Sequence, residues 1–268
     1  MDGPSADPLG RLAEWKAATD ATRTRLVEEV RAAARARGVS RIILGLSGGL
    51  DSSTTAALCT EAVGPENVLG ILMPHRMTSQ TSLAMAQGVV NALGITSRRV
   101  NLSPLIDAYF ANFPDASRVR RGIGAAWMRN GVVVDLGHHY TAVVVQSVNR
   151  TDRLLRYGDG LLEMQAALQP LGTLFKSQVR FLAEALGVLP EIRARRPSLE
   201  YWAGQSDETD LGRSYEELDP ILEALADGRD TPEQLRARAV SPGAVEWAAD
   251  ALRTGVSLAA VTPARAGV

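Results

Sequence analysis

Residues 47–53 read Ser-Gly-Gly-Leu-Asp-Ser-Ser, a mixture of small and polar residues suited to holding the phosphates of ATP. Gly48 and Gly49 let the backbone turn tightly and approach a ligand without a Cβ atom in the way. We expect a helix to begin near Ser52, with its free N–H groups and positive dipole end directed at the same point. Hydroxyl donors come from three serines of this loop: Ser47, Ser52 and Ser53.

Asp51 is the acidic residue of this loop, and a carboxylate is poorly placed beside phosphate unless Mg²⁺ lies between the two. The simplest alternative is a small polar turn between a strand and a helix, since Ser-Gly-Gly turns are common. The longer pattern Ser-Gly-Gly-x-Asp-Ser after a buried strand is uncommon, which favours the phosphate site. The loop matches neither Gly-x-Gly-x-x-Gly nor Gly-x-x-x-x-Gly-Lys-Ser, so it indicates neither a dinucleotide fingerprint nor a Walker loop.

The elements around the loop must position it, and hydrophobic spacing predicts an alternation of strands and helices. The predicted strands are residues 41–46, 68–73 and 97–102, and the predicted helices are residues 9–37, 52–63 and 79–93. Strands and helices that alternate at this spacing imply right-handed crossovers, and hence a parallel sheet with helices on both faces. The predicted fold class is therefore α/β and Rossmann-like.

The remainder of the chain is less regular. Residues 132–134 and 141–145 are candidates for later strands, and from Ser177 onward the sequence predicts mostly helix and loop. Residues 225–268 are rich in Pro, Gly and Ala, which indicates short helices and a loose tail. Because the chain shows no internal repeat and no long linker, we predict one domain. The predicted domain spans residues 1–268 and has a core at about 20–225 and a helical tail over 226–268.

The composition narrows the class of protein. The chain has 268 residues, 46% hydrophobic and 22% charged, with a formal net charge of -1, which is typical of an ordinary globular protein. This charge argues against a nucleic-acid partner or an anionic membrane surface. Cys59 is the single cysteine, which excludes an intramolecular disulfide and a zinc site built on several thiolates. With no apolar run typical of a signal peptide or membrane span, we expect a cytoplasmic protein.

The basic residues are unusual, because all of the 29 except Lys16 and Lys176 are arginines. A genome-wide codon bias is the simplest cause. Where arginine serves every general need for positive charge, a surviving lysine marks a place that requires a compact ammonium group.

At this point the sequence shows a resemblance to a known group of enzymes. Ser47-Gly48-Gly49-Leu50-Asp51-Ser52 resembles the pyrophosphate loop of the N-type ATP pyrophosphatases, which split ATP into AMP and pyrophosphate to activate a carboxyl or carbonyl oxygen. NAD synthases, GMP synthases, asparagine synthetases and tRNA-thiolating enzymes belong to this group. Further segments are similar to the NAD synthase branch: residues 64–79, 157–160, 170–179 and 197–219. Together the resemblance covers about residues 20–225.

The resemblance implies roles for particular charged residues. Lys176 falls on the family's lysine, which implies a point charge on an ATP phosphate or on the departing pyrophosphate; the alternative is a solvated lysine at a helix start. Asp207 and Glu208 stand where the family has acidic residues near the nucleotide or substrate. A capping role for them, at a helix beginning near Asp210, is equally compatible with the sequence. Arg118 matches an arginine of a family helix, which implies a contact to the nucleotide.

The metal site follows from the same resemblance. A family segment that helps to hold ATP and metal, Gly-Thr-x-Asn-x-Ser/Thr-Glu, corresponds to residues 146–152 here, and Asp152 replaces its glutamate. The resemblance therefore implies that Asp51 and Asp152 hold Mg²⁺. Gln146 replaces the family's glycine, and we expect its side chain to crowd any group that passes close to that backbone.

The implied reaction has two steps. A substrate carboxylate attacks the α-phosphorus of ATP, pyrophosphate leaves, and ammonia then displaces AMP to form an amide. The chain has no room for a glutaminase domain, and Cys59 lies within a predicted helix, so free ammonia or a separate glutaminase must supply the nitrogen. The family also works as a homodimer, which implies a homodimer here.

Several segments depart from the family pattern: residues 114–121, 146–152 and 252–259. Two explanations fit, namely a divergent NAD synthase or a relative that amidates a different carboxylate. Altered substrate segments beside a retained ATP loop slightly favour the second. An alternative of another class is a non-catalytic nucleotide-binding subunit, although retention of both Asp51 and Lys176 argues against it. His138 and His139 receive no role, since neighbours on a predicted strand point in opposite directions.

Overall fold

The computed structural model describes residues 8–157, 168–202, 204–238 and 240–256. Its centre is a parallel sheet with the strand order β3-β2-β1-β4. The strands are β1 (Ile42–Gly45), β2 (Val68–Leu72), β3 (Thr96–Arg99) and β4 (Val143–Val145). In register, Ile42 of β1 lies opposite Val68 of β2 and Val143 of β4. The predicted α/β class with a parallel, Rossmann-like sheet is confirmed.

The two faces of the sheet are covered by different helices because side chains alternate along each strand. Ile42 and Leu44 of β1 belong to the hydrophobic core shared with one set of helices, whereas Ile43 belongs to the core on the opposite face. The helices of the first face are α2 (Thr19–Ala36), α3 (Leu50–Val63), α4 (Gln80–Leu93) and α8 (Lys176–Ala185). The other face is covered by α6 (Arg118–His139), against which α5 (Ser103–Phe110) packs.

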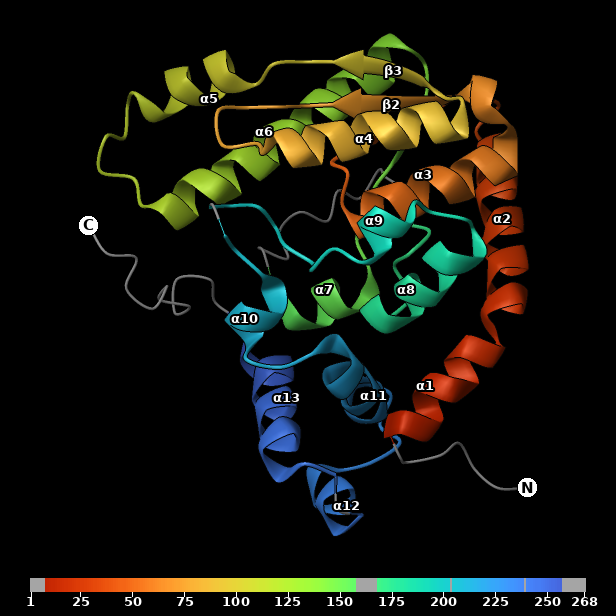
Figure 1. Cartoon of the computed structure of the whole chain (residues 1–268), viewed down its shortest axis with the longest axis vertical. Helices are drawn as coiled ribbons and strands as arrows, with labels where there is room; N and C mark the ends of the chain where they lie inside the picture. The colour runs from red at the N-terminus through yellow and green to blue at the C-terminus, as the bar shows by residue number, and fades with distance from the viewer. Residues whose placement is uncertain (1–7, 158–167, 203, 239, 257–268) are drawn as a thin grey trace.

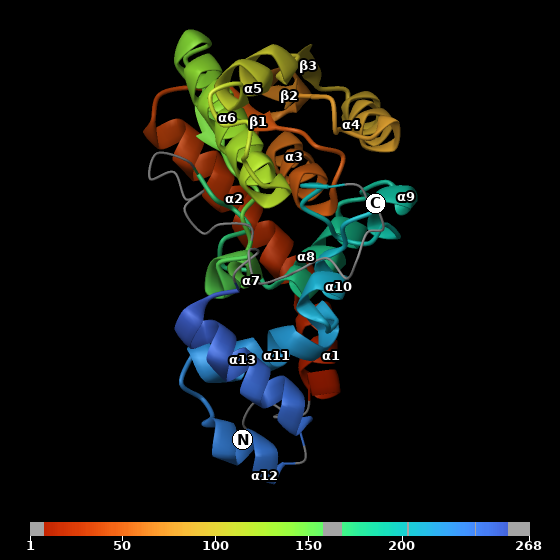
Figure 2. The same ribbon diagram turned by 90° about the vertical axis from the view of Figure 1, so that its left-hand side faces the viewer.

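A second group of helices lies below the sheet in the views of Figures 1 and 2. It contains α1 (Pro8–Ala17), α7 (Arg150–Leu155), α10 (Asp207–Leu211), α11 (Tyr215–Ala226), α12 (Pro232–Ala237) and α13 (Pro242–Thr254). These helices share their own hydrophobic core, in which Trp15 stacks on Phe175 with ring centroids 5.3 Å apart. Two short helices complete the described elements, η1 (Pro65–Asn67) and α9 (Pro190–Arg193). The helical C-terminal part of the prediction is confirmed as far as residue 256.

Some predicted elements differ from the structure. Residues 132–134 were predicted as a strand but lie inside α6. Three consecutive valines favour a strand locally, yet Val133 and Leu136 bury one helical face against the sheet, and this packing decides the outcome. His138 and His139 accordingly lie in the last turn of a helix and not on a strand.

The remaining differences concern boundaries. The helix predicted over residues 9–37 is two helices, α1 and α2, which meet at Ala18. The helix after the phosphate loop begins at Leu50, two residues before the predicted start. The third strand ends at Arg99, earlier than predicted. Among the described residues, no helix combines the length and the apolar character that crossing a membrane requires.

Candidate active site

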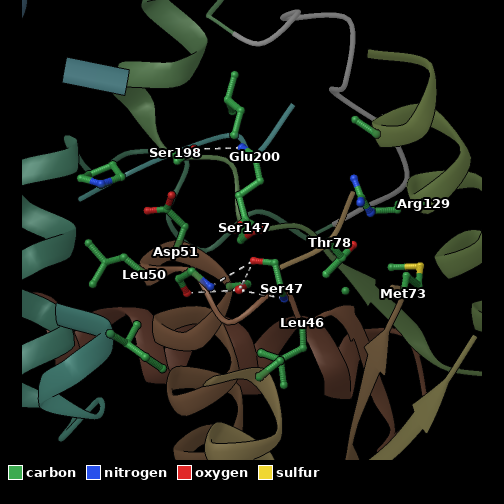
Figure 3. A pocket seen from close by; sticks show the side chains of 18 of the residues that line it. Leu46, Ser47, Leu50, Asp51, Met73, Thr78, Arg129, Ser147, Ser198 and Glu200 are labelled. Atoms are coloured by element: carbon green, nitrogen blue, oxygen red, sulfur yellow. Dashed lines mark hydrogen bonds between the residues drawn. The ribbon is translucent and has the colours of Figure 1, made fainter. Parts of the chain in front are cut away.

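A cavity of about 330 Å³ opens at the carboxyl ends of the strands, where ligands of parallel α/β sheets bind. The cavity is lined beyond β1 by residues 46, 47 and 49–52, beyond β2 by Met73 and Pro74, and beyond β4 by Ser147. Figure 3 shows the loop after β1 at the floor of the cavity, with Asp51 on one side and Arg129 on the other. The cavity therefore runs along the end of the sheet, across the predicted phosphate loop.

The predicted phosphate loop ends at an uncapped helix N-terminus. The N-cap residue of α3 is Gly49, which has no side chain to satisfy the first N–H groups of the helix. Ser47 Oγ and Ser52 Oγ lie 2.9 Å apart, and Ser53 Oγ donates to the carbonyl of Gly49 over 2.7 Å. The loop is thus fixed by its own serines, and the first turn of α3 remains available to an anion.

Gly48 is required by packing and not by an open approach to the cavity. Its φ of +80° lies in the left-handed region, and a Cβ atom there would meet the carbonyl oxygen of Ser82 at 2.4 Å and the amide nitrogen of Ala86 at 2.7 Å. Both of these atoms belong to the backbone of α4, which cannot move easily. The glycine therefore lets the loop lie directly on α4.

Asp51 and Lys176 form an ion pair at the edge of this loop. Lys176 Nζ donates to Asp51 Oδ2, and the lysine side chain is only 5% exposed. The other carboxylate oxygen, Asp51 Oδ1, is buried and has no hydrogen-bond partner among the described residues. Asp51 comes from the start of α3 and Lys176 from the start of α8, so two helix N-termini meet here.

The charge on Lys176 is secured by three carboxylates. Burial lowers the pKa of Lys176, but Asp51, Asp152 and Asp207 together outweigh this effect and raise it above its ordinary value. Burial in turn raises the pKa of Asp152 to about 7 and that of Asp207 to about 6, while the positive charge of Lys176 opposes both shifts. The cluster is thus three acids around one ammonium group, with an excess of negative charge that a metal ion would relieve.

Asp51 and Asp152 fit a magnesium site. Both line the cavity, and Asp51 Oδ1 is a buried carboxylate oxygen without a partner. Across the described part of the chain, no group of three or more His, Cys, Asp or Glu side chains is arranged to hold a metal. Mg²⁺ beside a nucleotide commonly takes one or two carboxylates and completes its shell with phosphate oxygens and waters, so two acids suffice.

A buried aspartate on α11 anchors the helix that carries Lys176. Asp219 is fully buried and accepts hydrogen bonds of 2.7 Å from Ser177 N, Ser177 Oγ and Thr151 Oγ1. Thr151 Oγ1 also accepts from the backbone N–H of Lys176 over 2.9 Å. These bonds join α7, α8 and α11 at one point and fix the start of α8.

The structure brings most of the predicted site residues into one cavity. Those that line it are Ser47, Gly49, Asp51, Ser52, Asp152 and Lys176. Asp207 lies buried behind Lys176, at the N-terminus of α10, where it accepts from Tyr215 Oη over 3.2 Å and from Leu199 N over 3.1 Å. Arg118 lies exposed at the first position of α6 and is not among the lining residues.

Three other sequence features can be placed. Gln146 does not line the cavity; its side chain accepts from Gln169 Nε2 over 3.1 Å, so the expected crowding does not involve the described cavity wall. Cys59 is fully buried in α3, as expected for a core residue. Three of the quoted segments lie partly outside the described residues: 158–160 of the Tyr-Gly-Asp-Gly turn, Ala203 of the segment 197–219, and 257–259 of the altered segment near the C-terminus.

The cavity also contains residues that sequence reasoning missed. Arg129 reaches it from α6, and Arg195 and Glu200 reach it from the segment after α9. Glu200 has a φ of +53°, an uncommon conformation for a residue other than glycine, and pairs with Arg195 over 2.6 Å. Arg129 would have been found if residues 118–139 had been recognised as one helix, because Ala126, Arg129 and Val133 then share a face.

Comparisons with known proteins agree with this geometry. A sequence-family model described as NAD synthase matches residues 22–253. An "NH(3)-dependent NAD(+) synthetase" of Trichlorobacter lovleyi is 42% identical over 201 residues, which cover 75% of this chain and 74% of that protein. A protein with the same name from Chlorobaculum parvum is 38% identical over 217 residues, which cover 81% and 78% respectively.

Solved structures show the same fold. An NMN synthetase from Francisella tularensis superposes with a TM-score of 0.76 at 23% identity, over 93% of this chain and 98% of that one. An NH3-dependent NAD synthetase from Campylobacter jejuni gives a TM-score of 0.73 at 23% identity, over 88% and 93%. The family match, the sequence relatives and the phosphate loop at the end of a parallel sheet lead to one conclusion. This chain belongs to the NAD synthase family and is a carbon–nitrogen ligase of that family.

Proposed function

We propose that this protein uses ATP and ammonia to amidate deamido-NAD, forming NAD, AMP and pyrophosphate. The observation that carries the proposal is the pairing of Asp51 with Lys176 beside the uncapped N-terminus of α3, within a cavity that also contains Asp152. Sequence relatives that are 38–42% identical and named for ammonia-dependent NAD synthesis support deamido-NAD as the acid.

The first step joins the acid to AMP. A carboxylate oxygen of the acid attacks the α-phosphorus of ATP, the bond to the β-phosphate oxygen breaks, and pyrophosphate leaves. The first N–H groups of α3 and the ammonium group of Lys176 would hold the phosphates and neutralise the charge that builds on the leaving pyrophosphate. The fixed loop also keeps the phosphates in line with the attacking oxygen.

Asp51 and Asp152 are the residues that would hold Mg²⁺, the first through its unpartnered Oδ1. When bound, the ion would neutralise charge on the phosphate oxygens and polarise the phosphorus that is attacked. Because Lys176 is paired with Asp51, its own ammonium group would stay at a fixed position beside that carboxylate.

The second step forms the amide. The nitrogen of ammonia attacks the carbonyl carbon of the acyl-adenylate, the bond to the phosphate oxygen of AMP breaks, and one proton is released. A cavity wall closed by α6 and by the segment around Glu200 would limit the access of water, which competes with ammonia for the same carbon.

The proposal is tested by measuring pyrophosphate, AMP and NAD after mixing the protein with ATP, Mg²⁺, deamido-NAD and ammonium chloride. We expect equal amounts of the three products, with NAD formation dependent on ammonium. The variant Asp51→Asn keeps the shape of the residue and removes its charge, and we expect it to abolish most of the turnover. A wild-type protein that binds ATP but forms no NAD would reject deamido-NAD as the substrate.

A different carboxylate is the second candidate, because the segment at 146–152 departs from the family pattern next to the cavity. The same assay should therefore include nicotinate mononucleotide, nicotinate and other aromatic acids. A higher kcat/KM with one of these acids than with deamido-NAD would favour that acid. ATP binding without turnover of any acid would favour a non-catalytic nucleotide-binding subunit.

A further inference from the structure

Arg129 occupies an unusual position in α6. The helix turns Gly122, Ala125, Val133 and Leu136 inward, where all four are buried. Arg129 follows the same spacing, so a guanidinium group stands in a stripe of small and apolar residues. Figure 3 shows Arg129 on the cavity wall, across from Asp51.

Arg129 has no carboxylate partner among the described residues. Its hydrogen bond is to a ring nitrogen, His75 Nδ1, over 2.9 Å. Another arginine of the same cavity, Arg195, is paired with Glu200 over 2.6 Å, as is usual for a half-buried arginine. A purely structural guanidinium would need such an anion or several backbone carbonyls, and the described part of the chain supplies neither to Arg129.

His75 holds the guanidinium without neutralising it. Burial, together with the positive charge of Arg129, lowers the pKa of His75 to about 4, so its ring is neutral at physiological pH. The same Nδ1 atom lies 2.9 Å from Thr78 Oγ1, which also accepts from the backbone N–H of His75 over 3.0 Å. The loop after β2 therefore presents a fixed, uncharged acceptor that orients Arg129.

The electrostatics of Arg129 show a cation that lacks compensation. Burial lowers the pKa of Arg129, and the electrostatic effects of Tyr201 and Glu200 offset this only in part. The planar guanidinium group offers several N–H donors in a fork that matches the oxygens of a carboxylate or phosphate. An oxyanion that enters the cavity would supply the partner that the protein does not.

We infer that Arg129 is a substrate-binding residue for an oxyanion on the side of the cavity opposite Asp51, and that His75 is the positioning residue for its guanidinium. The oxyanion comes from one of the two substrates, either a phosphate of ATP or a carboxylate or phosphate of the acid. This inference rests on the proposed function for the identity of the acid. The residues that carry it are independent of the Asp51–Lys176 pair.

The test compares Arg129→Met, which removes the charge and keeps an unbranched side chain, with Arg129→Lys, which keeps a charge without the fork. Isothermal titration measures the affinity for a non-hydrolysable ATP analogue and, separately, for deamido-NAD. We expect Arg129→Met to weaken one of these affinities by about tenfold or more, as for a lost charge-assisted hydrogen bond, and Arg129→Lys to restore it only in part. The matched control is Arg25→Met, an exposed helical arginine outside the cavity that pairs with Glu29.

Each outcome has a defined meaning. A loss confined to the ATP analogue assigns the oxyanion to ATP, and a loss confined to deamido-NAD assigns it to the acid. Both affinities within about twofold of wild type, in a variant with an unchanged melting temperature, would overturn the inference. Because binding is measured without turnover, a loss of affinity in Arg129→Met would stand even if the wild type formed no NAD. If Arg129→Met failed to fold, Arg129→Lys would test the loss of the planar fork alone, and we expect a smaller loss of affinity for one of the two ligands.

The role of His75 is tested by a double-mutant cycle. His75→Ala should weaken the affinity for the same ligand that Arg129→Met affects, and by a smaller factor, because the guanidinium remains but is less well oriented. In the double variant, the loss should equal that of Arg129→Met alone. Additive losses would show that His75 does not act through Arg129.

Discussion

Asp51 and Lys176 meet although 125 positions separate them in the sequence, and the geometry of this pair explains why a lysine survives in a chain that otherwise uses arginine. A primary ammonium fits a space that is bounded by Asp51, Asp152 and Asp207, with the ring of Tyr215 5.6 Å away. A guanidinium is larger and planar, and it would displace at least one of these groups.

We therefore expect Lys176→Arg to lose most of the activity even though the charge is kept. The loss in kcat for pyrophosphate release should be on the order of 100-fold, as for the removal of one group that stabilises charge in the transition state. Lys16→Arg, at the exposed lysine of α1, is the matched control and should behave as wild type. An active Lys176→Arg variant would show that only a general positive charge is needed at this position.

The raised pKa of Asp207 predicts how the stability of the ligand-free protein depends on pH. Burial raises its pKa from 3.8 to about 6, although Lys176 opposes the shift, so the folded state binds this proton more tightly than the unfolded chain. The contribution of Asp207 to stability is therefore fully present below the unfolded pKa and is lost as the pH rises through 6.

The measurement is the free energy of unfolding in urea between pH 5 and pH 8, for the wild type and for Asp207→Asn. The amide does not titrate; its oxygen can accept from Leu199 N, and its NH2 group can donate to Tyr215 Oη in place of the wild-type bond that Tyr215 donates. We expect the variant to gain stability relative to the wild type as the pH rises. A difference that does not change with pH would show that Asp207 has an ordinary pKa.

At the scale of elements, the position of Lys176 depends on how α8 is anchored. Asp219 on α11 accepts from the backbone N–H of Ser177 and from Thr151 Oγ1, which in turn accepts from the backbone N–H of Lys176. The lysine is therefore held through a residue that does not line the cavity. Asp219 is thus a positioning residue for the site.

Asp219→Ala leaves Ser177 N and Thr151 Oγ1 without their acceptor in a fully buried place. We expect a loss of about 2–4 kcal/mol in the free energy of unfolding, together with a lower kcat for pyrophosphate release. The shape-conserving variant Asp219→Asn should recover part of both, and Asp250→Asn, exposed on α13, should change neither. A destabilised Asp219→Ala variant with normal kcat below its melting temperature would mean that Asp219 supports the fold alone.

The elements also show what the sequence could predict. The strand at 41–46 and the loop after it were predicted because an apolar run followed by two glycines has few other interpretations. Residues 132–134 were misassigned since short apolar runs do not distinguish a strand from a buried helix, and only contact with the sheet decides. That error concealed Arg129, which precedes the segment taken for a strand and was assigned to no helix, so the helical face that it shares with Val133 was not recognised.

Contacts between residues far apart in the sequence likewise could not be predicted. The resemblance named Asp51, Asp152, Asp207 and Lys176, but their common position around one ammonium group depends on how α3, α7, α8 and α10 pack. The same holds for the contact between His75 and Arg129. His75 lies in the loop after β2, whereas Arg129 lies in α6, the helix that precedes β4. Spacing within one element can be read from a sequence, whereas contacts between elements require the fold.

At the scale of the whole molecule, the layered arrangement separates two surfaces with different character. The helical group around α11 and α13 buries its apolar residues in its own core. On the face of the sheet that α6 covers, α5 and α6 pack against each other yet leave large apolar side chains exposed: Leu105 at 47%, Tyr109 at 46% and Trp127 at 51%. Exposed apolar groups on adjoining helices are typical of a protein–protein contact.

The family resemblance predicts a homodimer, and we expect these two helices to contribute to its interface. Light scattering coupled to size-exclusion chromatography should then give about twice the 28.6 kDa mass of one chain. Trp127→Glu places a charge in the expected interface and should shift the protein toward the monomer, because an unpaired charge is costly to bury there. Ala32→Glu, exposed on α2 on the opposite face of the sheet, is the matched control and should remain a dimer. A monomeric wild type that turns over at the same concentration would contradict the prediction, and it would also mean that one chain alone completes the active site.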